Sequence, residues 1–348
     1  MQALTVAGGT VRLDGVPEPA AAEGSILAEA VALGVCGTDR EIVEGAFGQP
    51  PPGAERLIIG HESLGRVLEA PAGSGFGAGD LVVGIVRRPD PEPCPFCAAG
   101  EPDLCSNGRF TEHGISARHG FGSERWRIEP AYAVPGPPSL GVLGVLLEPA
   151  SIVAKAWEQV ERIDRRLPVP RPGRRALVLG AGPIGLLAAL GAVQRGFAVE
   201  VVDRVAAGRK PALVQALGAV PKTSVDDLEG AFDVILEASG APALAVPALH
   251  RLAPLGVAVV IGMPGPHARG ELGAPAFLRE LVLGNRLVLG VMNSNRRHFE
   301  QAARMLERAE RSWLEGLLTS RLPLAEAVSA FASRPDDIKT IVEFGPAG

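Results

Sequence analysis

The hydrophobic positions divide the chain into two parts with different patterns. In the first 150 residues, short apolar runs such as 26–28, 57–59 and 81–83 are separated by clusters of Gly and Pro. This pattern predicts short strands joined by long loops. Residues 150–162 contain neither Gly nor Pro, and they predict a helix that joins the two parts.

From residue 175 onward, apolar strands alternate with helices, and this alternation predicts a parallel, doubly wound sheet. The first helix of the alternation is expected at 184–194. The strands are expected at 176–179, 199–202, 234–237, 257–261 and 287–289. A tail with helices at 297–309 and 322–332 and a last strand at 341–344 is expected to return to the first domain.

Length and composition indicate a two-domain globular protein. A chain of 348 residues exceeds what one core usually supports. Apolar residues make up 47%, charged residues 21%, and the formal charge is -5, without a basic run for nucleic acid or an anionic membrane. No N-terminal signal and no membrane-spanning stretch is recognisable, which favours the cytoplasm. The expected partner is a small molecule.

A glycine-rich turn follows the strand expected at 176–179. Gly180, Gly182 and Gly185 form a GxGxxG pattern between an apolar strand and an apolar helix. Gly180 permits the tight turn, Gly182 lets backbone N–H groups approach a pyrophosphate, and Gly185 lets the helix pack closely on the strand. The alternative is a crowded turn without a ligand, but the acid at the end of the next strand favours a dinucleotide.

That acid is Asp203, whose carboxylate can accept hydrogen bonds from the ribose hydroxyls of NAD and would repel the 2′-phosphate of NADP. Arg204, Arg209 and Lys210 follow, and such cations could hold that phosphate. Arg209 and Lys210, taken individually, are more typical of a solvated loop. The sequence therefore favours NAD, with NADP as the alternative.

A second group of residues has the chemistry of a metal site. Cys36 and the pair His61 and Glu62 each follow a short apolar run, and they offer a thiolate, an imidazole and a carboxylate. These ligand types suit a zinc ion that keeps one position open for substrate. Glu148 ends another apolar segment, where a carboxylate needs a charged partner. Singly, Cys36 and His61 are typical of core side chains; their combination with a dinucleotide domain indicates a metal site.

The chain resembles the medium-chain, zinc-dependent dehydrogenases, and within them the glucose dehydrogenase branch. The segments that carry the resemblance are 34–44, 60–62, 110–114, 119–121, 147–149, the glycine turn and 291–298. The resemblance implies an α/β protein with a mainly β, GroES-like catalytic domain and a doubly wound, parallel-sheet Rossmann domain. It implies a catalytic domain at 1–155 and 296–348 and a Rossmann domain at 156–295.

The resemblance also implies roles for individual residues. The catalytic zinc would be held by Cys36, His61 and Glu62, with Glu148 joining them or holding the sugar. Substrate contacts would come from Thr38, Glu112, Glu148 and Asn293, and Thr38 would pass the released proton to solvent. Cofactor contacts would come from Gly180, Ala181, Gly182, Pro183, Ile184, Gly185, Asp203, Arg204, Val291, Met292, Asn293 and Lys339. Without the resemblance, Glu112 and Lys339 are equally typical of exposed surface charges.

The other three cysteines, Cys94, Cys97 and Cys105, crowd into one Gly- and Pro-rich segment. In a cytosolic protein this crowding suggests a metal, and the spacing is close to that of a closed structural zinc site. Where the family carries the first cysteine of this lobe, the chain has Pro91, which offers no ligating atom. Asp90 or Glu92 could substitute through an oxygen, or the lobe could be empty. The sequence favours a bound zinc and leaves its fourth ligand open.

Together these features predict zinc-dependent oxidation of a sugar hydroxyl, at C1 of a glucose-like aldose and to the lactone, with hydride transfer to NAD(P). The nearest alternative is a zinc polyol or cyclitol dehydrogenase of a biosynthetic pathway. A zinc-free quinone or enoyl reductase would need none of the metal ligands, and a non-catalytic NAD(P)-sensing protein would turn over no polyol. The relatives imply a homotetramer or homodimer.

Overall fold

The computed structural model describes residues 1–169, 173–265, 268–270, 272–332 and 336–345. The chain forms two compact units: unit 1 comprises Met1–Ser151 with Asn293–Gly348, and unit 2 comprises Ile152–Met292. The domain boundaries expected from the sequence, 155/156 and 295/296, lie a few residues C-terminal to these. Among the helices of the described residues, none has the length and apolar content that a membrane span needs.

Unit 1 is built mainly of short strands. They are β1 (Gln2–Ala7), β2 (Thr10–Gly15), β3 (Ile26–Val35), β4 (Leu57–Ile58), β5 (Glu62–Glu69), β6 (Leu81–Gly84), β7 (Arg87–Arg88), β8 (Thr111–His113), β9 (Ala117–Arg118), β10 (Arg125–Ile128), β11 (Ala133–Pro135), β18 (Leu318–Pro323) and β19 (Lys339–Glu343). Its helices are α1 (Gly37–Val43), α2 (Pro95–Ala98), α8 (Arg296–Glu307) and α9 (Arg311–Leu317), and α3 (Leu147–Asp164) begins here.

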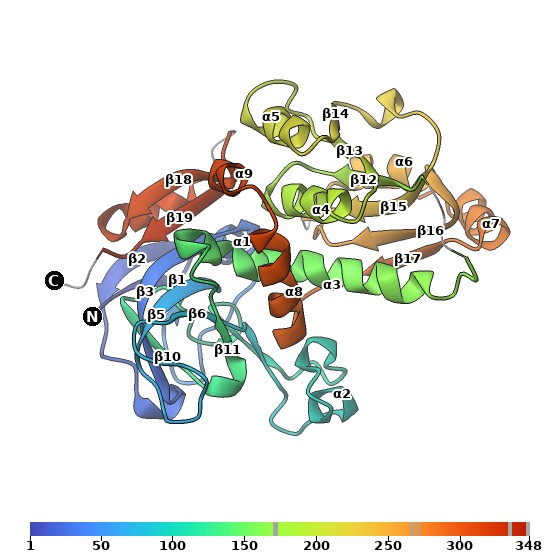
Figure 1. Cartoon of the computed structure of the whole chain (residues 1–348). Coiled ribbons are helices and arrows are strands. Elements are labelled where there is room, and N and C mark those ends of the chain that lie inside the picture. The colour runs from blue at the N-terminus through green and yellow to red at the C-terminus, as the bar shows by residue number, and fades with distance from the viewer. Residues whose placement is uncertain (170–172, 266–267, 271, 333–335, 346–348) are drawn as a thin grey trace. The chain divides into compact units, whose positions relative to one another are not determined.

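The largest sheet of unit 1 has the strand order β11-β6-β5-β3-β19-β18, and β10 also pairs with β3 (Figure 1). Its core includes Phe121 and Trp126, whose rings meet edge to face at 4.9 Å. Two smaller sheets have the orders β2-β1-β4 and β7-β8-β9. The loops between these strands hold the metal-type side chains described below.

The C-terminal tail returns to the sheet of unit 1, as expected. β19 runs antiparallel to β3, with Thr340 opposite Val35. The helix expected at 322–332 is partly wrong, because Leu322 and Pro323 end β18 and only Leu324–Phe331 is helical, as a 3-10 helix. The parallel ladder of β18 with β19 satisfies the backbone there, and this long-range pairing outweighs the local helical pattern.

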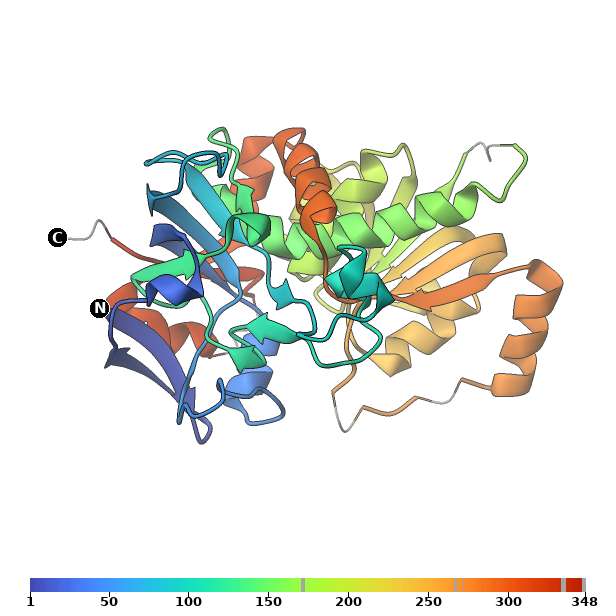
Figure 2. The same cartoon turned by 90° about the horizontal axis from the view of Figure 1, so that it is seen from below.

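Unit 2 is the doubly wound domain expected from the alternation. Its strands are β12 (Arg175–Leu179), β13 (Ala198–Val202), β14 (Val220–Lys222), β15 (Phe232–Glu237), β16 (Leu252–Val260) and β17 (Leu287–Gly290), and its helices include α4 (Pro183–Val193), α5 (Arg209–Ala216), α6 (Pro242–Leu249) and α7 (Ala274–Gly284). All pairings are parallel, in the order β14-β13-β12-β15-β16-β17. Figure 2 shows α7, in orange at the right, next to the end of the sheet where β17 begins.

The strand order of unit 2 reverses between β12 and β15. From β12 the chain proceeds outward through β13 to β14, and then crosses back to β15 on the other side of β12. Ligands of such sheets bind beyond the carboxyl ends of the strands at this switch point. The glycine turn follows β12 directly and therefore lies at the expected place for a dinucleotide.

Candidate active site

Two adjacent strands of unit 1 bring a thiol and an imidazole together. β3 and β5 are antiparallel, with Gly34 opposite Glu62. Cys36 follows β3 and caps the N-terminus of α1, whereas His61 directly precedes β5. The Nε2 of His61 lies 3.2 Å from the Sγ of Cys36. Strand pairing thus joins two residues that are 25 positions apart in the sequence.

Asp39, in the first turn of α1, holds the other side of this imidazole. Its Oδ1 lies 3.2 Å from the Nδ1 of His61, and its Oδ2 accepts a hydrogen bond of 2.9 Å from the backbone N–H of Cys36. Burial alone would lower the pKa of His61, but Asp39 and Cys36 raise that pKa well above its usual value. The surroundings of this ring therefore favour positive charge, as a cation site requires.

Sequence reasoning assigned no role to Asp39. The available signal was its position three residues after Cys36, which is the spacing of a side chain that reaches back to the helix N-cap. A carboxylate behind a histidine is also the usual device that orients the ring toward a metal. We therefore add Asp39 to the candidate site as the residue that positions His61.

Glu62 is buried against a lysine from the C-terminal tail. The Nζ of Lys339 lies 2.7 and 2.5 Å from the two carboxylate oxygens of Glu62. Both residues are at most 2% exposed. A Cβ at Gly34 would lie 1.9 Å from the Oε2 of Glu62, so only glycine leaves room for this carboxylate. The structure thus places Lys339, expected at the cofactor, in an ion pair with Glu62.

Glu148 lies in the first turn of α3 and is only 8% exposed. One of its carboxylate oxygens falls within 4.8 Å of ligand atoms of both His61 and Glu62. Burial raises the pKa of Glu148 to about 7, although His61 and Lys339 oppose the shift. Among the described residues, none donates a hydrogen bond to this carboxylate. A buried acid without a donor is a group that a bound cation would satisfy.

These residues fit a zinc ion. Two sets have ligand atoms that all lie within 4.8 Å of one another, Cys36–Asp39–His61 and His61–Glu62–Glu148. Sulfur, imidazole nitrogen and carboxylate oxygen are the ligands that zinc accepts in catalytic sites. Within the described chain, no such set contains Cys36 together with Glu62 or Glu148, so His61 is the link between the two halves.

The residues expected to hold the sugar are joined to this cluster. The Nδ2 of Asn293 donates a hydrogen bond of 2.6 Å to the Oε1 of Glu112 in β8. The next residue, Ser294, has its hydroxyl 2.6 Å from that of Ser151, which donates to the backbone carbonyl of Glu148. A series of hydrogen bonds therefore runs from the carboxylate of Glu112 to the backbone carbonyl of Glu148.

The chain that follows β8 also packs closely against the residue before His61. A Cβ at Gly114, which follows β8, would lie 2.4 Å from the carbonyl oxygen of Gly60, the residue before His61. Thr38, the remaining residue with a predicted substrate role, is half-buried in the first turn of α1. Unit 1 thus contains all four predicted substrate residues: Thr38 in α1, Glu112 in β8, Glu148 in α3, and Asn293.

The three cysteines of the lobe also lie together. Cys94 caps α2, and its Sγ accepts a 3.5 Å hydrogen bond from the backbone N–H of Cys97. The three Sγ atoms of Cys94, Cys97 and Cys105 lie within 4.8 Å of one another. The N–H groups of Cys97 and Ser106 lower the pKa of Cys94 to about 6. These thiols fit three corners of a tetrahedral zinc site.

The two acids considered for the fourth ligand point to another partner. The Nε of Arg109 lies 3.2 Å from Asp90 Oδ2, and its Nη2 lies 2.9 Å from Glu92 Oε2. Asp90 is 2% exposed and also accepts the N–H of Glu92. A carboxylate from either residue would have to leave Arg109 before it could complete the metal site. Neither Asp90 nor Glu92 therefore supplies the fourth corner of the lobe in this arrangement.

The glycine turn of unit 2 has the geometry that its sequence requires. Gly180 has a φ of 93°, and a Cβ at Gly185 would lie 1.8 Å from the carbonyl oxygen of Gly180. Asp203 accepts the N–H of Ala181 at 2.7 Å, which ties the acid to the turn. Lys210 lies 3.8 Å from Asp203 and is half-buried, so it is not the solvated side chain considered from the sequence.

The other residues with predicted cofactor roles lie at the ends of the strands of unit 2. Gly182 caps α4, and Pro183 opens it with Ile184 in its first turn. Arg204 follows Asp203 and is exposed. Val291 and Met292 follow β17, and the Nζ of Lys155, in α3, donates to the carbonyl of Met292 at 3.0 Å. These groups share the carboxyl edge of the sheet, where a dinucleotide is expected.

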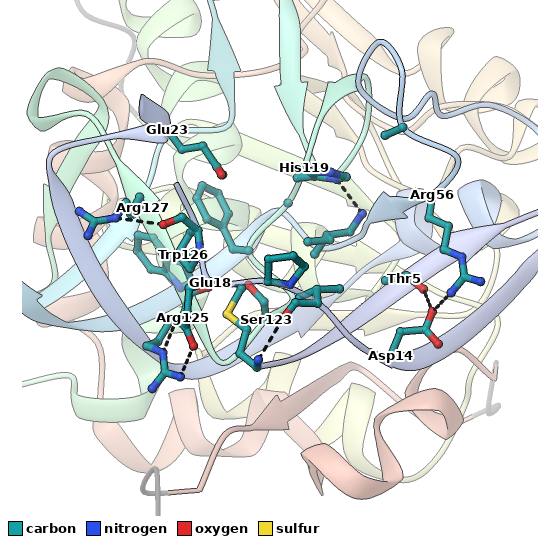
Figure 3. A pocket seen from close by; sticks show the side chains of 18 of the residues that line it. Thr5, Asp14, Glu18, Glu23, Arg56, His119, Ser123, Arg125, Trp126 and Arg127 are labelled. Carbon is teal, nitrogen blue, oxygen red and sulfur yellow. Dashed lines mark hydrogen bonds and ion pairs between the residues drawn. The ribbon is translucent and has the colours of Figure 1, made fainter. Parts of the chain in front are cut away.

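Unit 1 also contains a separate pocket of about 500 Å³, lined by Pro19, Ile58, Phe121 and Trp126 among others (Figure 3). Cys36, His61, Glu62 and Glu148 do not line it. Charged side chains at its rim already pair with one another, Arg56 with Asp14 and Arg125 with Glu18. The pocket is therefore distinct from the metal cluster.

Comparison with known proteins identifies both parts of the chain. The family model described as the alcohol dehydrogenase GroES-like domain matches residues 22–138. The model described as the glucose dehydrogenase C-terminus matches residues 141–344. The two matches follow one another and together span most of the sequence.

Relatives match over the full length. A glucose 1-dehydrogenase of Thermoproteus tenax is 41% identical, over 99% of both chains, and one of Methanocella arvoryzae is 37% identical over 97% of this chain and 96% of its own. Among solved structures, the Haloferax mediterranei glucose dehydrogenase in complex with NADP, Zn and gluconolactone superposes with a TM-score of 0.91 at 33% identity, covering 99% of both chains. The chain therefore belongs to the glucose dehydrogenase family of the medium-chain, zinc-dependent dehydrogenases.

Proposed function

We propose that this protein is a zinc-dependent glucose 1-dehydrogenase, which oxidises the C1 hydroxyl of a glucose-like aldose to the lactone and passes the hydride to NAD(P). One observation carries the proposal: hydrogen bonds connect Glu112 and Asn293, two residues able to bind sugar hydroxyls, to the backbone of Glu148, whose buried carboxylate belongs to the ligand cluster around His61. The Haloferax mediterranei relative, which has been solved with Zn, NADP and gluconolactone, supports it.

The catalytic zinc would be held by Cys36, His61 and Glu62, with Glu148 as a further ligand. When bound, zinc supplies a Lewis acid that lowers the pKa of a substrate hydroxyl. Asp39 contacts the Nδ1 of His61 at 3.2 Å, and Lys339 holds Glu62. Glu148 has no such partner among the described residues, so it is the carboxylate most able to move between metal and sugar.

Sugar recognition is assigned to Glu112, Glu148, Asn293 and Thr38. Carboxylate and amide groups that are half-buried discriminate strongly for hydroxyl-bearing substrates, because a ligand without the hydroxyl would leave them unpaired. The hydroxyl of Thr38 would accept the proton of the C1 hydroxyl and pass it to solvent. The substrate is therefore a sugar rather than a simple alcohol.

The nicotinamide cofactor would bind on the glycine turn, with NAD preferred and NADP as a second cofactor. Asp203 supports NAD, whereas Arg204 and Lys210 supply charge for the phosphate of NADP. Asp203→Ala should raise the NADP-to-NAD ratio of kcat/KM by about tenfold to a hundredfold, because a charged hydrogen bond contributes about 1.5–3 kcal/mol. Arg204→Ala should shift this ratio the other way. An unchanged ratio in both variants would place the adenosine pocket elsewhere.

The proposal includes a homo-oligomer that pairs through the open edge of the sheet of unit 2. β17 ends the strand order, and α7 beside it exposes Leu278, Val282 and Leu283 by 58, 76 and 71%. An open strand edge can pair with its own copy across a two-fold axis, and the apolar helix face would be covered in the same contact. This contact alone makes a homodimer, and a homotetramer would need a second interface.

Light scattering of a charged variant tests this interface. Val282→Lys should lower the molar mass in solution toward that of a monomer. Val220, 49% exposed on β14 at the opposite edge, provides the control, since Val220→Lys should leave the mass unchanged. Equal masses for both variants and the unchanged protein would contradict pairing at β17.

The free cysteines are consistent with the proposed cytoplasmic location, where thiols stay reduced.

A substrate screen tests the proposed activity. The zinc-loaded protein is mixed with aldoses and cyclitols and with either NAD or NADP, and the absorbance of the reduced nicotinamide is followed. Glucose or a close aldose should give the highest kcat/KM. Turnover confined to cyclitols would assign the protein to the polyol branch, and no turnover with any sugar would refute the proposal.

A further inference from the structure

Glu112 faces a buried arginine across the pairing of β7 with β8. Arg87 lies directly opposite Glu112 in this antiparallel pair and is 3% exposed. Its guanidinium covers the ring of Phe110 at 3.5 Å from the ring centre, and its Nη1 lies 3.4 Å from the backbone carbonyl of Asp103. Stacking and hydrogen bonds on several sides fix the position of this cation.

The hydrogen bonds and the ion pair of the Glu112 carboxylate all involve one oxygen, Oε1. The Nε and Nη2 of Arg87 both lie 3.0 Å from Oε1, and the Nδ2 of Asn293 lies 2.6 Å from the same atom. Among the described residues, none has a recorded contact with Oε2. Two hydrogen bonds and the ion-pair contact of Nη2 hold Oε1 in place and leave the other oxygen with full acceptor capacity.

We propose that Arg87 is a positioning residue for sugar recognition: it holds Oε1 of Glu112 so that Oε2 accepts a hydrogen bond from one ring hydroxyl of the aldose. The inference rests on the proposed function, because it assigns the orientation of a residue in that sugar site. Asn293 is the second support of the same oxygen. Its backbone has a φ of 60°, and its Oδ1 accepts the N–H of Ser294 at 2.8 Å, so its side chain is also held.

The neighbouring arginine, Arg88, has a similar environment but contacts a different acid. Arg88, in the same two-residue strand, is 4% exposed, donates to Glu129 at 2.8 Å and covers the ring of Tyr132 at 3.9 Å. Successive residues of a strand point to opposite faces. Arg88 therefore points away from Glu112 and makes the same kinds of contact with Glu129 instead. It provides a matched control for substitutions of Arg87.

The test compares glucose with 2-deoxy-, 3-deoxy-, 4-deoxy- and 6-deoxyglucose in Arg87→Lys, Glu112→Gln, the double variant and Arg88→Lys. In the unchanged enzyme, one deoxy sugar should be a poor substrate because it lacks the hydroxyl that Oε2 binds. Arg87→Lys should lower kcat/KM for glucose by about tenfold to a hundredfold, the size of a lost charged hydrogen bond, and leave that deoxy sugar unaffected. Arg88→Lys should keep the full discrimination.

The double variant shows whether the two residues act as a unit. Arg87→Lys combined with Glu112→Gln should be no worse than Glu112→Gln alone, because the arginine acts only through the carboxylate. Equal losses for glucose and all four deoxy sugars in Arg87→Lys, or additive losses in the double variant, would overturn the proposal. If Arg87→Lys does not fold, Arg87→Gln, which keeps an amide donor, is measured in the same way.

The controls separate this inference from the proposed function. If the unchanged protein oxidises no aldose, the proposed function itself fails. If it oxidises glucose but Arg87→Lys behaves like Arg88→Lys, only the role of Arg87 fails.

Discussion

The two metal-type clusters of unit 1 differ in how their ligands are supplied. The His61 cluster combines sulfur, nitrogen and oxygen ligand atoms from residues at the ends of β3 and β5 and in the first turns of α1 and α3, and it has more carboxylates than a zinc ion needs. The cysteine lobe combines three thiols from the N-cap and interior of α2 and from the end of a 3-10 helix at Pro102–Leu104, and its nearby acids are paired with Arg109.

This difference matches two uses of zinc. A catalytic site needs mixed ligands, an open position and supporting groups such as Asp39 and Lys339 that orient the ligands. A structural site needs four firm ligands and no open position, and the lobe presents three. We therefore expect the His61 cluster to govern turnover and the lobe to govern local stability.

The largest effect should come from removing the residue that links the two halves of the catalytic cluster. His61→Ala should lower kcat for the sugar by about three orders of magnitude or more, because a Lewis acid stabilises the charge of the transition state by several kcal/mol. Zinc analysis and circular dichroism should show a lost metal and a retained fold.

The lobe provides the control for this variant. Cys97→Ser removes a ligand type from the other cluster and should change kcat less than tenfold, while it lowers the thermal midpoint by about 2–4 °C for each kcal/mol lost. Similar losses of kcat in both variants would show that the two clusters do not have separate roles.

An intermediate effect is expected from releasing the acids of the lobe. Arg109→Ala should free Asp90 to complete the set of Cys94, Cys97 and Cys105, and tighten zinc binding there by roughly tenfold, the scale on which supporting groups change metal affinity. Zinc release is followed with a chromogenic chelator. Arg56→Ala is the control, because Arg56 is similarly exposed and pairs with Asp14. Faster release from Arg109→Ala than from Arg56→Ala would show that the ion pairs support the metal instead.

The smallest effect concerns His113, a buried histidine of unit 1 that belongs to neither of the two clusters. His113 donates from Nδ1 to the carbonyl of His119 at 2.6 Å and accepts from the Nε of Arg118 at 2.9 Å. Burial, followed by the charges of Arg88 and Arg118, lowers the pKa of His113 well below its usual 6.5. The folded protein therefore holds this ring neutral.

The sign of the pH effect follows from that neutral state. Below about pH 6.5 the unfolded chain binds a proton that the folded protein does not, so the free energy of unfolding falls as the pH decreases, by at most about 1.4 kcal/mol per unit. Well above pH 6.5 the ring is neutral in both states, so His113 no longer makes the free energy of unfolding depend on pH. Urea unfolding of His113→Gln should show a shallower loss of stability below pH 6.5 than the unchanged protein. Parallel curves would mean that His113 titrates equally in both states.

Local patterns predicted the elements of unit 2 well because each depends on neighbouring residues. The strand β12, the glycine turn and α4 are continuous in sequence, and the required φ of Gly180 and the close packing of Gly185 follow from that local order. The helical expectation at 322–332 was partly wrong because β18 is stabilised by pairing with β19, which a local window does not contain.

The sequence by itself determined the ligand chemistry of this protein, namely the thiol, imidazole and carboxylate types, the dinucleotide turn and the family. Only the tertiary structure decided how each group is held: Asp39 behind His61, Arg87 on Glu112, and Arg109 on the acids of the lobe. The pair of Glu62 with Lys339 joins residues 277 positions apart. Such pairs depend on which strands meet in the sheet, and strand pairing over that distance has no signature in the local sequence.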